Sequence, residues 1–202
     1  MASDGVRLAE SANRRRQERF RLLVMGELDR LYGLAYRLVG RDAEDAVQDC
    51  LLKAYRGLDG LGDDAAARRW FTAILVNCCR DRGRARQRQP DEVELDDDVE
   101  RFSLFRKIAD EDPFPYSDSL HVDFLGQFDR DDLHAVLLDL PQIYRVPLVL
   151  VHMEGFPTRE VAELVDAPLG TVLARLHRGR KLLERRLWEY AESHGLIEEG
   201  TP

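Results

Sequence analysis

The sequence contains no run of eighteen uncharged apolar residues, so no segment is expected to cross a membrane. Its N-terminus has no apolar segment before a small-residue cleavage site, and no secretory signal is visible. Aromatic residues make up only 8% of the chain against 34% charged residues, which indicates much exposed helix surface rather than one deep core. These features favour a soluble, cytoplasmic protein of one or two globular domains.

Cysteine is scarce and odd in number, with Cys50, Cys78 and Cys79 as the three thiols. Adjacent cysteines rarely bridge each other, so we expect reduced thiols, with redox sensing as the alternative. The histidines share no ligand spacing with these cysteines, and the sequence therefore predicts neither a metal site nor a cofactor. The histidines are His121, His134, His152, His177 and His194.

The chain also lacks the period-2 alternation of β-strands, whereas apolar residues recur with helical spacing nearly everywhere. The sequence therefore predicts an all-α protein of two small helical domains joined by an extended acidic linker. The predicted parts are a flexible N-terminus (1–16), a first domain (17–89), the linker (90–128), a second domain (129–193) and a C-terminal tail (194–202).

Two apolar stripes define the first helices of the first domain. Gly40 separates them, and Asp42 stands where the N-cap of the second helix is expected. A third helix carries Trp70 and Phe71, which we interpret as core residues. The stripes consist of Leu28, Leu31, Leu34, Ala35 and Leu38, then Ala43, Ala46, Val47, Cys50, Leu51 and Ala54.

The second domain is predicted to hold four helices, broken at Pro141, at 155–157 and at Pro168. Thr158 is the expected N-cap of the third, and Pro168 is expected in the first turn of the fourth. The fourth helix has an apolar side and, opposite it, a polar side. This is the arrangement of a helix-turn-helix whose second helix enters the DNA major groove. The alternative is a charged solvent face. The apolar side holds Leu169, Val172, Leu176 and Leu183, and the polar side holds Thr171, Arg175 and Arg178.

Charge is distributed in blocks, although the net charge is −8. Residues 80–88 hold five arginines and one aspartate, and residues 175–186 hold five arginines, one lysine and one glutamate. Between them, residues 91–100 hold seven acids and no base, which excludes independent folding. The basic blocks indicate contacts with a polyanion. The acidic block is either a solvated tether or a nucleic-acid mimic that occupies a cationic cleft.

The segment "LPQIYRVPLVLVHMEGFPTREVAELVDAPLGTVLARLHRGRKLL" resembles region 4 of the extracytoplasmic-function (ECF) sigma factors of bacterial RNA polymerase. The match is carried by "REVAEL", "GTV" and "RLHRGR", while Leu173-Ala174 departs from the family, which often has a basic residue or methionine and then serine. The resemblance implies contacts with the polymerase β flap and with the promoter −35 element. Its DNA-contacting residues would be Arg159, Thr171, Arg175, Arg178 and Lys181.

Two segments of the first domain are similar to sigma region 2. "GRDAEDAVQDCLLKAY" resembles region 2.2, which in this family grips the clamp helices of the polymerase β′ subunit, and "RRWFTAILVNCCRDRGRARQR" resembles regions 2.3 and 2.4, which hold the melted −10 element. An acidic face that merely stays solvated is the alternative for the first. The resemblance assigns Asp42, Asp45, Gln48 and Asp49 to polymerase binding, and Asn77, the loop before Trp70, Arg80, Arg84 and Arg86 to the −10 element. Platforms for unstacked bases are the alternative role of Trp70 and Phe71. Cys78 and Cys79 stand where the family usually carries small or apolar residues, so the resemblance implies that they are buried.

The resemblance implies a sigma factor that directs core polymerase to promoters and that an anti-sigma factor controls, as in stress-responsive members. It implies no enzyme activity, and the sequence shows no nucleophile–base pair. A response regulator would need an alternating β/α receiver, which the chain lacks. A repressor would need a self-complementary dimer interface and would bind promoters without polymerase.

Overall fold

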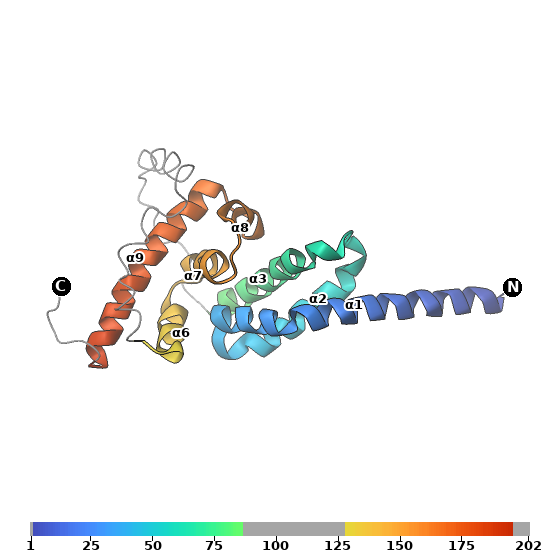
Figure 1. Cartoon of the computed structure of the whole chain (residues 1–202), viewed down its shortest axis with the longest axis horizontal. Coiled ribbons are helices and arrows are strands. Elements are labelled where there is room, and N and C mark those ends of the chain that lie inside the picture. The colour runs from blue at the N-terminus through green and yellow to red at the C-terminus, as the bar shows by residue number, and fades with distance from the viewer. Residues whose placement is uncertain (1, 87–127, 196–202) are drawn as a thin grey trace. The chain divides into compact units, whose positions relative to one another are not determined.

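The computed structural model describes residues 2–86 and 128–195, and the side chains of residues 10–82 and 128–195 (Figure 1). Within these ranges every regular element is a helix or a helical turn, which confirms the all-α prediction. The chain divides into two compact units between Arg82 and Gly83. Among the described residues, no helix combines the length and the apolar character needed to span a bilayer.

The first unit is built from three helices and short helical turns. Helix α1 (Ala2–Val39) is followed by the turn η1 (Gly40–Asp42) and helix α2 (Ala43–Gly57). Two further turns, η2 (Leu58–Gly60) and η3 (Asp64–Ala66), lead into helix α3 (Ala67–Arg86). Gly40 adopts φ +61°, a left-handed conformation that glycine tolerates, and this ends α1 where the sequence predicted.

The core of the first unit follows the two predicted stripes, except that Leu51 is only half-buried and Leu28 is exposed. Leu28 is 40% exposed, so its assignment to the buried stripe of α1 is wrong. It lies three residues before Leu31, at the edge of an arc whose other members point toward α2. The three cysteines and Phe71 are buried as predicted, and Trp70 is half-buried against Phe71 with ring centroids 5.1 Å apart. Fully buried are Leu31, Leu34, Ala35, Leu38, Ala46, Cys50, Ala54, Phe71, Leu75 and Cys79.

Helix α1 begins at Ala2 rather than near Gln17, so the structure differs here from the sequence prediction. Two arginines fix its middle to the rest of the unit. Arg16 Nη2 donates to the Tyr55 carbonyl at 2.8 Å, and Arg19 Nη2 donates to the Leu61 carbonyl at 2.7 Å. These long-range contacts supply tertiary support that periodicity in the polar segment did not reveal.

Between residues 128 and 195 the second unit contains four α-helices, and the breaks between them lie where proline and glycine predicted them. Helix α6 (Arg130–Asp139) is followed by α7 (Gln142–Leu148), which continues as a π-helical turn, η4 (Val149–Met153). Helices α8 (Thr158–Leu164) and α9 (Leu169–Ser193) complete the unit. Asp129 caps α6 through a reciprocal capping box with Asp132.

The predicted N-cap at Thr158 is wrong by one position. Pro157 is the N-cap of α8, and Thr158 is already its first helical residue. Pro168 likewise is the N-cap of α9 rather than a member of its first turn. Both prolines have ψ near +140°, the extended geometry of an N-cap, and neither helix start has a side-chain capping bond.

Helix α9 packs closely on α7 because position 179 is glycine. A Cβ at Gly179 would lie 3.0 Å from Leu148 Cδ1 and 3.1 Å from Tyr144 Cβ. Near its other end, α9 is attached to α6, since the Tyr190 hydroxyl donates to the Asp132 carboxylate and Arg186 Nε lies 3.1 Å from Asp139 Oδ2. Contacts along its length therefore fix the orientation of α9 within the unit.

Candidate functional surfaces

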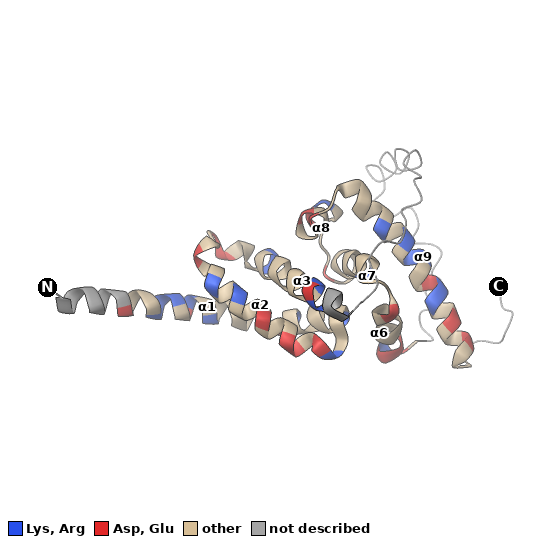
Figure 2. Cartoon of the chain, turned by 180° about the vertical axis from the view of Figure 1, so that it is seen from behind, with Lys and Arg blue, Asp and Glu red and all other residues tan. Residues whose placement is uncertain are grey.

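The first surface is the acidic side of α2. Asp42 is the N-cap residue of this helix but makes no side-chain capping bond, and Asp45, Gln48 and Asp49 follow within two turns. The structure thus brings the four predicted residues together along the first half of one helix, on the side away from its buried residues. Figure 2 shows the acidic positions along α2. The buried side consists of Ala43, Ala46, Val47, Cys50 and Ala54.

Arg82 of α3 reaches this acidic surface, a contact that the sequence interpretation missed. Its Nη2 donates to Asp49 Oδ2, and its Nη1 lies 3.6 Å from Asp45 Oδ2. The bond to Asp49 holds the pKa of Arg82 above its usual value, and Asp45 and Asp42 act in the same direction. Helical spacing could have indicated the contact, since Arg82 lies one turn after the buried Cys78 and therefore shares its inward side of α3.

The predicted −10 residues lie along the C-terminal half of α3. Asn77 is exposed, and Arg80, one turn later, is half-buried. The helix continues through Arg84 and Arg86, whose side chains are outside the described residues. The structure therefore places Asn77 and Arg80 on one described face of α3.

The neighbouring cysteines belong to the core rather than to this surface. Burial raises the pKa of the Cys50 thiol to about 12 and also raises that of Cys78. Thiols of raised pKa hold little reactive thiolate at neutral pH. The prediction of cysteines used for packing is confirmed.

The third surface belongs to α8, the turn after it and α9, which form a helix-turn-helix. Asp166 in the turn has φ +51°, so the chain reverses sharply before Pro168 starts α9. Val172 and Leu176 are buried, as predicted for the docking side. On the other side the predicted residues are partly or fully accessible. Thr171, Arg175 and Arg178 are half-buried, whereas Arg159 on α8 and Lys181 on α9 are exposed.

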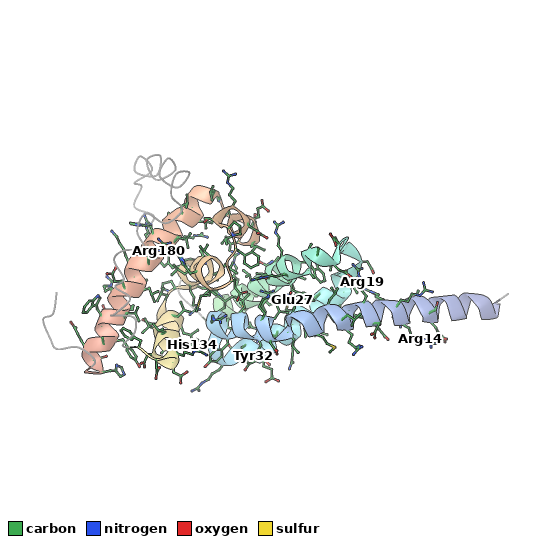
Figure 3. The ribbon with its side chains drawn as sticks, in the orientation of Figure 1. Arg14, Arg19, Glu27, Tyr32, His134 and Arg180 are labelled. Atoms are coloured by element: carbon green, nitrogen blue, oxygen red, sulfur yellow. The ribbon has the colours of Figure 1, made fainter. Side chains whose placement is uncertain are left out.

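Part of the basic block on α9 is paired with other helices of the same unit instead. Arg180 projects from α9 (Figure 3), and its Nη2 lies 3.1 Å from His152 Nε2 of η4. Arg186 pairs with Asp139 of α6. Burial lowers the pKa of both His152 and Arg180. A neutral imidazole nitrogen can accept a bond from a guanidinium, so Arg180 supports packing of the unit.

Comparison with known proteins assigns both units. Residues 23–89 match the family model "Sigma-70 region 2", and residues 130–183 match "Sigma-70, region 4". These segments fall inside the two domains predicted at 17–89 and 129–193. In the parts of the chain that the structure describes, no three His, Cys, Asp or Glu side chains are grouped as a metal site.

Curated relatives match over nearly the whole chain. The ECF RNA polymerase sigma-E factor of Haemophilus influenzae is 30% identical over 182 residues, which cover 89% of this chain and 93% of that protein. The ECF RNA polymerase sigma factor SigW of Bacillus subtilis is 29% identical over 164 residues, which cover 79% and 83%.

Two solved structures share the fold. The sigma factor RpoE in complex with the anti-sigma factor NepR from Bartonella quintana gives a TM-score of 0.54 at 25% identity and covers 85% of this chain and 98% of that one. CnrH in complex with the cytosolic domain of CnrY gives a TM-score of 0.54 at 23% identity, covering 86% and 90%, and supports the fold alone. With two sigma regions in order along an all-α chain, and relatives matched along almost their full length, this protein belongs to the extracytoplasmic-function sigma factors of the sigma-70 family, which act in transcription initiation.

Proposed function

We propose that this ECF sigma factor docks on the polymerase β′ clamp through α2, holds the melted −10 element with α3, and reads the −35 element with α9. The observation that carries the proposal is the separation of charge between surfaces. An accessible acidic side lies on α2, whereas accessible cations lie on the outward side of the helix-turn-helix.

The docking step rests on the exposed carboxylates of α2. Asp45 and Asp49 have side chains that are 66% and 48% exposed, so a cationic partner can reach both. Complementary charge accelerates such an encounter and fixes its register. We expect the contact to weaken as ionic strength rises, because the carboxylates are not shielded from solvent.

The −35 step rests on the side of α9 that carries Thr171, Arg175 and Arg178, away from the buried Val172 and Leu176. Arginine's planar fork can bind a guanine edge or a phosphate bidentately. Arg175 and Arg178 lie three residues apart on that side, and Thr171 in the first turn lies one turn before Arg175. Amide hydrogens at the start of α9, around Gly170, are available to a backbone phosphate. The β flap is the proposed polymerase partner of this unit.

The −10 step rests on α3 and on the loop before it. Asn77 is exposed and can hydrogen-bond a base that has left the stack, while Arg80 lies one turn further toward the basic end of the helix. Arg84 and Arg86 complete the proposed set of backbone contacts.

Regulation and the linker belong to the same proposal. The neighbouring RpoE structure contains the anti-sigma factor NepR, and we propose that an anti-sigma factor also holds this chain inactive by covering the α2 and α9 surfaces. The acidic run at 91–100 lies outside the described residues. We propose that it enters the cationic cleft of the polymerase and later yields to the transcript.

The protein is proposed to act in the cytoplasm as a non-enzymatic initiation subunit. Its net charge of −8 opposes binding to free DNA, so promoter selectivity arises only when polymerase sets the spacing of the two units. The test is a pull-down with core RNA polymerase followed by run-off transcription. We expect association and a defined start site, whereas tight, specific promoter binding in a gel shift without core enzyme would contradict the proposal.

A further inference from the structure

Arg82 occupies the acidic surface of α2 from within the same unit. Its guanidinium bridges two carboxylates one helical turn apart, through the Nη2 bond to Asp49 and the 3.6 Å approach of Nη1 to Asp45. The remaining nitrogen, Nε, is buried and has no hydrogen-bond partner. Release of the guanidinium into solvent would hydrate this nitrogen, which offsets part of the cost of giving up the two carboxylates.

Helical register separates Arg82 from the other arginines of its block. Successive residues of an α-helix are about 100° apart, so Arg80 and Arg84 occupy positions about 40° from each other, whereas Arg82 is about 200° from Arg80. Arg82 instead shares the side of Cys78, which is buried in the unit. The run of alternating arginines is thus divided between two sides of α3, and Arg82 lies on the side that contacts the carboxylates of α2.

We infer that Arg82 is an internal counter-ion of the docking surface, competes with the cations of the polymerase for Asp45 and Asp49, and takes no part in DNA binding. The inference rests on the proposed docking role of α2. Arg82 is 28% exposed, less than either carboxylate, so an incoming cation meets the acids first. The carboxylates then exchange Arg82 for a cation of the polymerase. The net free energy of binding is therefore smaller than it would be if the carboxylates had no internal partner.

The arrangement has a direct consequence for affinity. The carboxylate partners are 66% and 48% exposed, and ion pairs with such accessible groups contribute little to folding stability, so we expect the unit to remain folded without Arg82. It also leaves one more unit of negative charge available to a cationic partner. The pairing with Arg82 therefore lowers the affinity of the acidic surface for polymerase below the affinity that the same carboxylates would have without it.

The experiment measures binding of the full-length, fluorescently labelled chain to core RNA polymerase at several salt concentrations. Arg82→Gln is expected to tighten binding about fivefold at low salt, the size of one additional charge contact near a protein surface, with the gain shrinking as salt rises. Arg82→Lys keeps the cation and is expected to bind like the unmodified chain. Arg21→Gln is the matched control, since Arg21 pairs with Glu18 at 2.8 Å on α1 and its loss changes net charge equally.

A second measurement tests the separation from DNA. The salt dependence of promoter complexes, formed at saturating polymerase, reports the number of phosphate contacts. Arg82→Gln is expected to leave this slope unchanged, whereas Arg80→Gln lowers it by about 0.7 to 0.9, the value of one contact. Thermal unfolding of each variant verifies that the first unit is folded.

The outcomes separate the inference from the function on which it rests. If Asp45→Asn with Asp49→Asn leaves polymerase binding unchanged, α2 is not the docking surface and the proposed function fails there. If those variants weaken binding but Arg82→Gln weakens it too, or has no effect, Arg82 organises the surface or is neutral, and the inference alone is overturned. A reduced salt slope for Arg82→Gln would show a phosphate contact and overturn it as well.

Discussion

Gly179 sets the distance between α9 and α7, and the cost of adding one methyl group there follows from the structure. The new Cβ would meet Leu148 Cδ1 at 3.0 Å and Tyr144 Cβ at 3.1 Å, and Tyr144 Cβ, bonded directly to the backbone, cannot move independently. Overpacking of this kind costs about 1–3 kcal/mol. Alanine recovers about 1 kcal/mol over glycine through helix propensity. We expect Gly179→Ala to lower the free energy of unfolding of the second unit by about 1 kcal/mol.

Gly170 provides the matched control on the same helix. A Cβ at this position meets nothing within 4 Å, so Gly170→Ala keeps the propensity gain without the clash. It is expected to stabilise the second unit by up to about 1 kcal/mol. The two substitutions are chemically identical, and only the surroundings of the added methyl group differ.

The assay uses the two tryptophans, of which Trp70 lies in the first unit and Trp188 in the second. In a Trp70→Phe background, the fluorescence of Trp188 reports urea unfolding of the second unit alone. With a denaturant slope of about 1–3 kcal/mol per molar urea, Gly179→Ala should lower the midpoint by about 0.5 M relative to its parent. If Gly179→Ala is as stabilising as Gly170→Ala, the close approach of α7 and α9 is incorrect.

Three other predictions concern DNA, the linker and pH. Arg175→Gln is expected to weaken −35 binding by the holoenzyme about 5- to 150-fold, the value of about 1–3 kcal/mol for a bidentate contact, whereas Arg185→Gln, which removes an exposed pair with Glu189, changes it little. Competition binding with −35 duplexes measures the affinity of each variant. Equal losses of affinity for the two variants would argue against recognition of the −35 element by Arg175. Neutralising the acids of 91–100 is expected to reduce polymerase affinity or initial transcription, and unchanged promoter output together with unchanged abortive product would contradict the role given to the linker. The hydrogen bond from Tyr190 is the main cause that lowers the pKa of Asp132, so the stability it contributes is present at neutral pH and lost as pH falls through that lowered pKa. Tyr190→Phe should therefore flatten the decline in urea midpoint that occurs as the pH falls below about 4, near the ordinary pKa of an aspartate, and an unaltered decline would refute the linkage.

Much of the fold could be predicted because helical periodicity and breakers act locally. Glycine with left-handed geometry ends α1 at Gly40, and prolines mark the starts of α8 and α9. The errors also have local causes. Leu28 has the spacing of a stripe residue but lies at its edge, and Thr158 has the chemistry of an N-cap but follows a proline whose backbone already has that geometry.

The contacts of the surfaces were harder to predict because they join residues far apart in the sequence. Charge counting treated residues 80–88 as one basic block, yet Arg82 is paired with acids more than thirty positions earlier. It also treated residues 175–186 as one block, although Arg180 contacts His152 and Arg186 contacts Asp139. The sequence shows which charges a helix carries. Contacts with neighbouring helices determine which of these charges stay accessible to DNA or polymerase.

Helix α9 has 25 residues and a length of about 37 Å, and it carries proposed DNA contacts in its first half and attachments to α6 in its second. Because the helix is stiff, a tilt of about 5° at its C-terminal, attached end displaces its N-terminal end by about 3 Å. This displacement is close to the rise between neighbouring base pairs. The Tyr190–Asp132 and Arg186–Asp139 contacts therefore help to position the proposed DNA-contacting side chains, which lie several turns away along the same helix.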